Sequence, residues 1–227
     1  MCNPACVDFA RTNLTLAQVK GKFVLEVGSL NVNGSVRQFV ETLEPGKYIG
    51  VDIVGGPGVD LVCRADELLQ RFGESSFDLL VSTEMLEHVR DWRRVVINFK
   101  HVLRPGGSLL LTTRSYGFGY HGFPYDFWRY ELSDLRQIFA DFTIENLEAD
   151  PLSPGVFLKA RKPGDFVEQN LDVCLYSIIT NRRVFEISKY DFYMFQARYH
   201  LQRLLGFGIR IPRFMRRIIF QSLHREH

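Results

Sequence analysis

The sequence predicts an α/β protein with a Rossmann-like, mostly parallel sheet that carries helices on both faces. Short apolar runs alternate with helical patterns from residue 20 to residue 162, an order typical of parallel sheets. The first run ends at Gly28 and the second at Asp52. Glycine and an acidic residue at the ends of strands favour a ligand site at the carboxyl edge of the sheet.

Each element is assigned from its hydrophobic period. The expected strands cover residues 23–27, 48–52, 59–62, 77–82, 108–113, 142–147 and 156–160. The expected helices cover residues 35–43, 68–72, 89–102 and 132–139. We expect the helix over 89–102 to stop at Arg104-Pro105-Gly106-Gly107, because proline and glycine terminate helices.

Three segments are expected along the chain. Residues 1–19 form a helical lead-in, residues 20–162 form the α/β domain, and residues 163–227 form a helical, basic extension. A chain of 227 residues provides one sizeable core and an appendage.

Charge and cysteine content narrow the function. The net charge of +2 carries no polyanion signature, so we expect no nucleic-acid partner. The four cysteines form no CxxC pair and the histidines do not have zinc-ligand spacing, so we assign no metal ligands. The start of the sequence does not resemble a signal peptide. Unpaired thiols then favour a cytoplasmic protein.

The last thirty residues are basic, with seven arginines and one acidic residue between Arg198 and His227. The segment 212–220 reads as a basic amphipathic helix that begins at a proline. It could lie on a lipid surface, or it could pack on the domain or on a second copy in a homo-oligomer. We favour packing, because the aromatic residues upstream also need to be covered.

The loop after the first strand indicates an adenosine-containing ligand. Asp52 stands 18 positions after Gly34, where a carboxylate accepts both ribose hydroxyls. A dinucleotide would need small residues at Leu30 and Val32 to admit its pyrophosphate. Glu26 would also place a negative charge near those phosphates, whereas it suits a ligand with an ammonium and a sulfonium group. S-adenosylmethionine therefore fits better than a nicotinamide dinucleotide.

Five ordered motifs now give a family resemblance: VLEVGSLNVNGS, YIGVDI, CRADEL, FDLLVSTEMLEHV and VLRPGGSLLLTT. Together they resemble the class I S-adenosylmethionine-dependent methyltransferases of the type 11 group, over about residues 22–162. The resemblance implies seven strands with the last one antiparallel. It also implies cofactor contacts from Glu26, Gly28, Gly34, Asp52, Ile53, Ala65 and Thr83.

Two positions depart from the family pattern. Leu30 stands where a second glycine is usual, and Arg64 stands where many relatives have an aspartate. Asp66 is the alternative contact for the adenine amino group, unless that contact is absent.

The loop 114–130 leaves the carboxyl edge of the sheet, where an acceptor should bind. It resembles an HG-P-D-WRY pattern of related methyltransferases. We assign His121 as the catalytic base, since the ordinary pKa of a histidine lies near neutrality, and Asp126 as the group that orients it. Tyr125, Arg129 and His88 are candidate substrate contacts. The competing interpretation makes Asp126 and Arg129 a local structural pair, Trp128 and Tyr130 core aromatics, and His88 a helix-packing residue.

The sequence thus predicts a methyltransferase that uses S-adenosylmethionine to methylate a small molecule, at a hydroxyl of a sugar or other hydroxylated metabolite. N- or C-methylation is the alternative within the class. A catalytically silent methyltransferase-like scaffold and a nicotinamide-dependent oxidoreductase are the alternatives outside it. Glu84 and Glu87 are read as ordinary acidic residues in a first helical turn.

Overall fold

The computed structural model describes residues 3–122 and 125–206, and it divides the chain into two compact units, residues 1–186 and 187–227. The first unit contains a seven-stranded sheet with the order β3-β2-β1-β4-β5-β8-β7. Its strands are β1 (Phe23–Val27), β2 (Lys47–Asp52), β3 (Leu61–Val62), β4 (Phe77–Thr83), β5 (Leu103–Arg114), β7 (Thr143–Ala149) and β8 (Gly155–Arg161). Among these strands, β8 alone runs in the direction opposite to the other six. The predicted fold class is confirmed.

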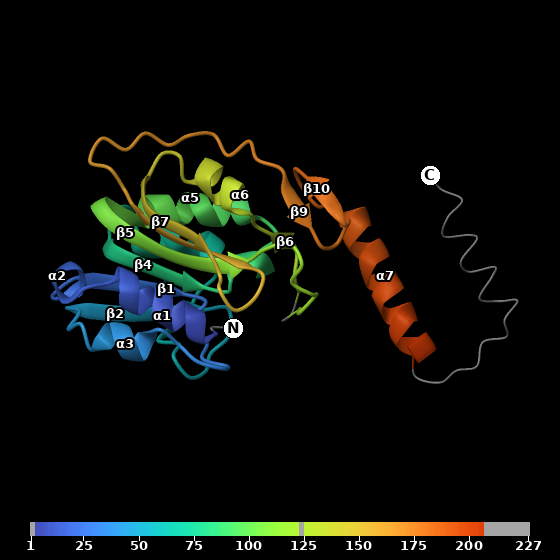
Figure 1. Cartoon of the computed structure of the whole chain (residues 1–227), viewed down its shortest axis with the longest axis horizontal. Helices are drawn as coiled ribbons and strands as arrows, with labels where there is room; N and C mark the ends of the chain where they lie inside the picture. Colours follow the sequence, from blue (N-terminus) through green and yellow to red (C-terminus); the bar gives the residue numbers. More distant parts are fainter. Residues whose placement is uncertain (1–2, 123–124, 207–227) are drawn as a thin grey trace, which may run out of the picture. The chain divides into compact units, whose positions relative to one another are not determined.

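Helices lie on both sides of this sheet (Figure 1). They are α1 (Pro4–Asn13), α2 (Leu16–Val19), α3 (Arg37–Glu41), α4 (Leu68–Phe72), α5 (Trp92–Val102) and α6 (Leu132–Ile138), with two 3₁₀ turns, η1 (Ala65–Glu67) and η2 (Leu86–His88). One side chain in two along β1, β4 and β5 packs with α1 and α3, because successive strand residues point to opposite faces. The core therefore has two apolar layers.

Two element boundaries differ from the prediction for local reasons. Helix α5 begins at Trp92 rather than at Val89, because the Asp91 carboxylate accepts the backbone N–H of Arg94 at 3.4 Å and caps the helix. Residues 104–107 do not lie outside the sheet. They form an irregularity inside β5, which pairs with β4 on both sides of it.

The lead-in is an integral part of the domain core. Cys6, Phe9 and Ala10 of α1 are at most 3% exposed and pack with the sheet residues Val24 and Phe157. The rings of Phe9 and Phe157 are 5.1 Å apart. Burial of one face of α1 gives this helix the tertiary stabilisation that a ten-residue helix needs.

The first compact unit extends past the predicted boundary at residue 162 and continues to Glu186. A second small sheet, β10-β9-β6, joins β6 (Trp128–Arg129) to β9 (Leu175–Ser177) and β10 (Arg182–Val184). Arg93 of α5 also donates hydrogen bonds to the carbonyl groups of Leu171, Val173 and Phe185 at 2.6–2.9 Å. The segment 163–186 is therefore not a helical extension. It pairs with the α/β domain through β9 and β6, and β6 lies in the loop 114–130.

The second unit contains α7 (Lys189–Gly206). The predicted basic helix over 212–220 lies outside the described residues. Within the described part of the chain, no helix combines the length and the apolar character needed to cross a membrane.

Replacing Phe9 by alanine should lower the free energy of unfolding by about 3–5 kcal/mol, because the change leaves a cavity between α1 and the sheet. Urea denaturation measures this difference. Leu16→Ala is the control, since Leu16 is 46% exposed and such surface changes stay within about 0.5 kcal/mol. Equal stabilities of the two variants would mean that the lead-in does not belong to the core.

Candidate functional site

The carboxyl ends of β1, β2 and β4 meet at one edge of the sheet, since these strands are parallel neighbours. Gly28 follows β1 with a φ of 80°, and a Cβ atom there would lie 2.6 Å from the Cβ of Met85. Only glycine fits this position without displacing the segment after β4. The loop after β1 can therefore approach a ligand with its backbone, as the sequence predicts.

Asp52 lies at the end of β2 and is partly exposed. Its carboxylate accepts the backbone N–H of Leu30 at 3.1 Å and that of Val54 at 3.4 Å. The next residue, Ile53, is 51% exposed. A carboxylate beside an exposed aliphatic side chain provides hydrogen-bond acceptors for hydroxyl groups and an apolar surface for a flat ring.

Two further predicted cofactor contacts lie at the same edge. Thr83 is the last residue of β4 and is buried, whereas Ala65 opens η1 and is half-buried. The guanidinium of Arg64 pairs with the Asp66 carboxylate at 2.9 and 3.0 Å. The Asp66 carboxylate, which is the alternative contact for the adenine amino group, is therefore bound to Arg64.

Glu26 is buried beneath the loop after β1, with only 2% of its surface exposed. The Tyr48 hydroxyl donates to its carboxylate at 2.8 Å and the Ser35 hydroxyl at 3.4 Å. Burial raises the pKa of Glu26 to about 7, although both hydroxyls and the charge of Arg37 oppose the shift. Gly34 closes this loop by donating its N–H to the Asn31 side chain at 2.9 Å, with a φ of 132°.

His121, Asp126 and Arg129 come together in the loop 114–130. The Asp126 carboxylate lies 2.9 Å from His121 Nδ1 and accepts two hydrogen bonds from Arg129, at 2.6 and 2.7 Å. Arg129 is 1% exposed and also donates to the carbonyl groups of Phe118 and Gly119. Its guanidinium is thus fully engaged inside the protein. Arg129 positions Asp126, and the predicted substrate contact does not match this burial.

His121 faces a second carboxylate, that of Glu87, across 3.6 Å from Nε2 to Oε1. Burial lowers the pKa of His121, but Asp126 and Glu87 outweigh it and raise the pKa to about 9. The imidazole is therefore protonated at neutral pH when only these groups surround it. Its predicted role as a base for an acceptor proton stays a prediction.

His88 lies beside His121, with the two rings 4.8 Å apart. Its Nδ1 lies 2.6 Å from the backbone carbonyl oxygen of Tyr125, and its Nε2 lies 3.9 Å from Glu87 Oε1. Tyr125 contributes this carbonyl group, and 39% of its own surface is exposed. One ligand atom each from Glu87, His88 and His121 lies within 4.8 Å of the others, which is close enough for a metal ion.

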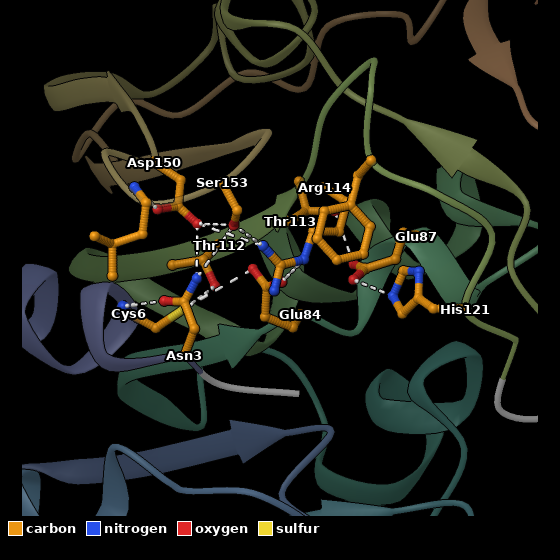
Figure 2. A network of polar contacts seen from close by, with 12 residues as sticks. Asn3, Cys6, Glu84, Glu87, Thr112, Thr113, Arg114, His121, Asp150 and Ser153 are labelled. Atoms are coloured by element: carbon orange, nitrogen blue, oxygen red, sulfur yellow. Dashed lines mark hydrogen bonds and ion pairs between the residues drawn. The ribbon is translucent and has the colours of Figure 1, made fainter.

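A buried polar network continues from this cluster to α1 (Figure 2). Arg114, at the end of β5, forms ion pairs with Glu84 and Asp150. The Sγ atom of Cys6 lies 3.8 Å from Glu84 Oε1 and 3.4 Å from Thr112 Oγ1. Burial raises the pKa of Glu84, as does the nearby charge of Glu87. Glu84 and Glu87 are thus buried and contact other polar side chains, Arg114 and Thr113. They are not solvent-exposed acids of a first helical turn.

Sequence reasoning missed three members of this edge: Tyr48, Arg114 and the buried role of Glu87. Tyr48 lies one strand away from Glu26 with its Cα in register two positions earlier, so only the strand pairing brings them together. For Glu87, the signal in the sequence was the density of polar residues after an apolar strand, because five of the seven residues from Ser82 to His88 are polar.

Comparison with known proteins adds a family to this geometry. Residues 25–111 match the family model described as "Methyltransferase domain". The match begins in β1 and ends in β5, so it contains the glycine loop, Asp52 and Glu87. This part of the chain is therefore similar to a methyltransferase domain.

Two curated relatives are similar to about half of this chain. A phthiotriol/phenolphthiotriol dimycocerosates methyltransferase of Mycobacterium ulcerans is 33% identical over 117 residues, which are 47% of this chain and 42% of the relative. A ubiquinone biosynthesis O-methyltransferase of Coxiella burnetii is 27% identical over 127 residues, which are 50% of this chain and 51% of the relative. The matches span about half the length of these relatives or less.

A solved structure shows the same fold. The 1,6-didemethyltoxoflavin-N1-methyltransferase of Burkholderia thailandensis, determined with S-adenosylhomocysteine, has a TM-score of 0.54 and 18% identity. The alignment covers 71% of this chain and 77% of that chain. The α/β domain of this chain therefore has the same fold as that enzyme.

The α/β domain should lose stability as the pH rises from about 4.5 to about 7. Glu26 has a pKa of about 7 in the folded state, against 4.5 as its ordinary value. The folded state therefore holds this proton more tightly, and the proton's contribution is complete below pH 4.5 and lost above pH 7. The shift corresponds to roughly 3 kcal/mol. Urea denaturation at several pH values measures it.

Glu26→Gln is the matched variant, because an amide keeps a hydrogen-bond acceptor for Tyr48 and does not titrate. The difference in unfolding free energy between wild type and variant should shift in favour of the variant as the pH rises. A difference that stays constant from pH 4.5 to pH 8 would contradict the assigned pKa.

Proposed function

We propose that this chain is an S-adenosylmethionine-dependent methyltransferase that methylates a small molecule at a hydroxyl oxygen. The observation that carries the proposal is the shared sheet edge. The glycine loop and Asp52 lie at the ends of β1 and β2, and the Glu87, His88 and His121 cluster follows the end of β4. This arrangement supports a nucleoside-binding surface next to a cluster of polar, proton-holding side chains.

The residues at this edge fit the cofactor. Gly28 admits no Cβ, so its backbone is open to close approach. Asp52 provides carboxylate oxygens for two ribose hydroxyls, and Ile53 provides apolar surface for adenine. We assign Thr83 and Ala65 to the methionine and adenine ends. Gly34 and Glu26 support this surface, since Gly34 closes the loop and Glu26 is bonded to Tyr48 beneath it.

When bound, S-adenosylmethionine supplies a methyl group already activated on its sulfonium. The protein then needs to align the acceptor and to exclude water. The loop 114–130 supports both tasks, because Asp126 is completely buried and Arg129 locks it to the loop backbone. His121 and Asp126 are the proposed catalytic pair, with Asp126 positioning the imidazole. His88 and Tyr125 are proposed to line the acceptor site.

A hydroxyl acceptor is favoured over an amine by the density of proton-holding groups. Methylation of a hydroxyl requires loss of its proton, and an amine has less need of such help. The Coxiella burnetii relative is named as an O-methyltransferase, which agrees with this choice. The Burkholderia thailandensis enzyme of the same fold is named as an N-methyltransferase, so N-methylation is the second candidate. Among the described residues, Cys6, Cys63 and Cys174 form no disulfide, which suits a reducing cytoplasm.

Asp52→Asn should weaken S-adenosylmethionine binding by about 10–100-fold. The charge-assisted hydrogen bonds to the ribose would become ordinary ones, at a cost of about 1.5–3 kcal/mol. Isothermal titration calorimetry measures the dissociation constant. Asp8→Asn is the control, because Asp8 lies on α1 and its side chain is 69% exposed. Wild-type protein that binds NAD and not S-adenosylmethionine would contradict the cofactor assignment.

Incubation with S-adenosylmethionine labelled with ¹³C at its methyl group should transfer the label to oxygen of a hydroxylated acceptor. Libraries of phenols, sugars and amines supply the candidates. The ¹³C chemical shift of the product distinguishes methyl groups on oxygen, nitrogen and carbon. Label found on nitrogen or carbon would replace the O-methylation assignment. Tight cofactor binding without transfer to any acceptor would favour a silent scaffold.

A further inference from the structure

We propose that Glu87, His88 and His121 bind a divalent first-row transition-metal ion beside the acceptor site. This inference goes beyond methyl transfer from S-adenosylmethionine, which does not itself require a metal. It also departs from the sequence-based expectation, because His88 and His121 are 33 positions apart and have no zinc-ligand spacing. The fold brings them together by placing the loop 114–130 against η2.

The three ligand atoms are close to coordination distance. Glu87 Oε1 lies 3.6 Å from His121 Nε2 and 3.9 Å from His88 Nε2, and the three atoms lie within 4.8 Å of one another. Ligands about 2.1 Å from a tetrahedral zinc ion are about 3.4 Å apart. Small side-chain movements would therefore bring all three atoms onto one ion.

Two of these atoms are buried without a hydrogen-bond partner. The Glu87 side chain has no exposed surface, and neither its Oε1 nor His121 Nε2 makes a hydrogen bond among the described residues. The 3.6 Å between them is too long for a hydrogen bond. Buried polar atoms normally have partners, and an unpaired carboxylate oxygen is costly. A cation between the three side chains would satisfy these atoms.

The outer contacts hold each ligand in the orientation that a metal site requires. His121 Nδ1 lies 2.9 Å from Asp126, which Arg129 fixes, and His88 Nδ1 lies 2.6 Å from the carbonyl oxygen of Tyr125. Both contacts favour a proton on Nδ1 and leave Nε2 as the metal ligand. At His121 Nε2, the metal ion and a proton taken from the acceptor are therefore alternatives. The Thr113 hydroxyl donates to Glu87 Oε2 at 2.9 Å and leaves Oε1 directed to the histidines. Figure 2 shows Glu87 between Thr113 and His121.

The set of two imidazoles and one carboxylate selects the class of metal. Calcium and magnesium prefer oxygen ligands, whereas imidazole suits iron, cobalt, nickel, copper and zinc. Three protein ligands leave positions for water or for oxygen atoms of the acceptor. If the proposed O-methylation is correct, such an ion would favour acceptors with two neighbouring oxygens, and that part of the inference depends on the proposed function.

Cobalt binding tests the site without any acceptor. The full chain, prepared without a histidine tag and treated with EDTA, is titrated with Co²⁺, and visible d–d absorption reports coordination. We expect one Co²⁺ per chain, displaced by Zn²⁺. Glu87→Gln, His88→Ala and His121→Ala should each weaken binding at least tenfold. Asp126→Asn should weaken it by about 10–100-fold, as expected for a group that orients a ligand.

His101→Ala is the matched control. His101 also contacts two carboxylates, those of Glu74 and Glu168, on the surface of the same domain. This variant should bind Co²⁺ like the wild type. His88→Ala serves as the safest ligand variant, because the His88 ring is partly exposed and its loss should not unfold the domain.

Co²⁺ binding that is absent, or unchanged in Glu87→Gln, His88→Ala and His121→Ala, would overturn the proposal. Glu87 and His121 would then form a plain ion pair. Calorimetry with S-adenosylmethionine on the same samples separates the two questions. Intact cofactor binding without a metal site contradicts only this inference, and loss of cofactor binding in the wild type contradicts the proposed function.

Discussion

Two buried carboxyl groups at the end of β4, those of Glu84 and Glu87, organise the polar interior of this domain. Burial of a charge is costly unless partners compensate for it. Arg114 pairs with Glu84, and Thr113 donates to Glu87, so both partners come from the end of β5. The pKa of Glu84 is raised by burial, whereas the histidine contacts hold that of Glu87 below its ordinary value despite burial. The pKa values of the two carboxyl groups are thus shifted in opposite directions.

These carboxyl groups also explain why three distant segments meet at one place. The lead-in contributes Cys6, the turn after β7 contributes Asp150, and the loop 114–130 contributes His121. Glu84 itself adopts a φ of 54°, a left-handed conformation that costs a residue other than glycine about 1–3 kcal/mol. The surrounding contacts maintain this strain at the carboxyl edge of the sheet, next to Thr83.

Much of the fold could be predicted from local sequence, because apolar strands and amphipathic helices have distinct periods. The glycine after β1 and the acid that ends β2 likewise predicted a ligand site at the carboxyl edge of the sheet. The boundary at residue 186 could not be predicted, since it depends on the pairing of Trp128 and Arg129 with Tyr176 and Ser177 in strands of two and three residues. The burial of Glu87 also escaped prediction, because its partners lie 26 and 34 positions away in the sequence. Site residues that depend on a folded loop have no local signal.

Because one fold supports many reactions, the proposed function depends on where the cofactor lies relative to Glu87, His88 and His121. A crystal structure of the complex with S-adenosylhomocysteine tests it most directly. We expect ribose hydroxyls on the Asp52 carboxylate, homocysteine over Gly28, and the sulfur atom facing the three side chains. An adenosine bound away from Asp52, or a sulfur atom directed away from the cluster, would contradict it.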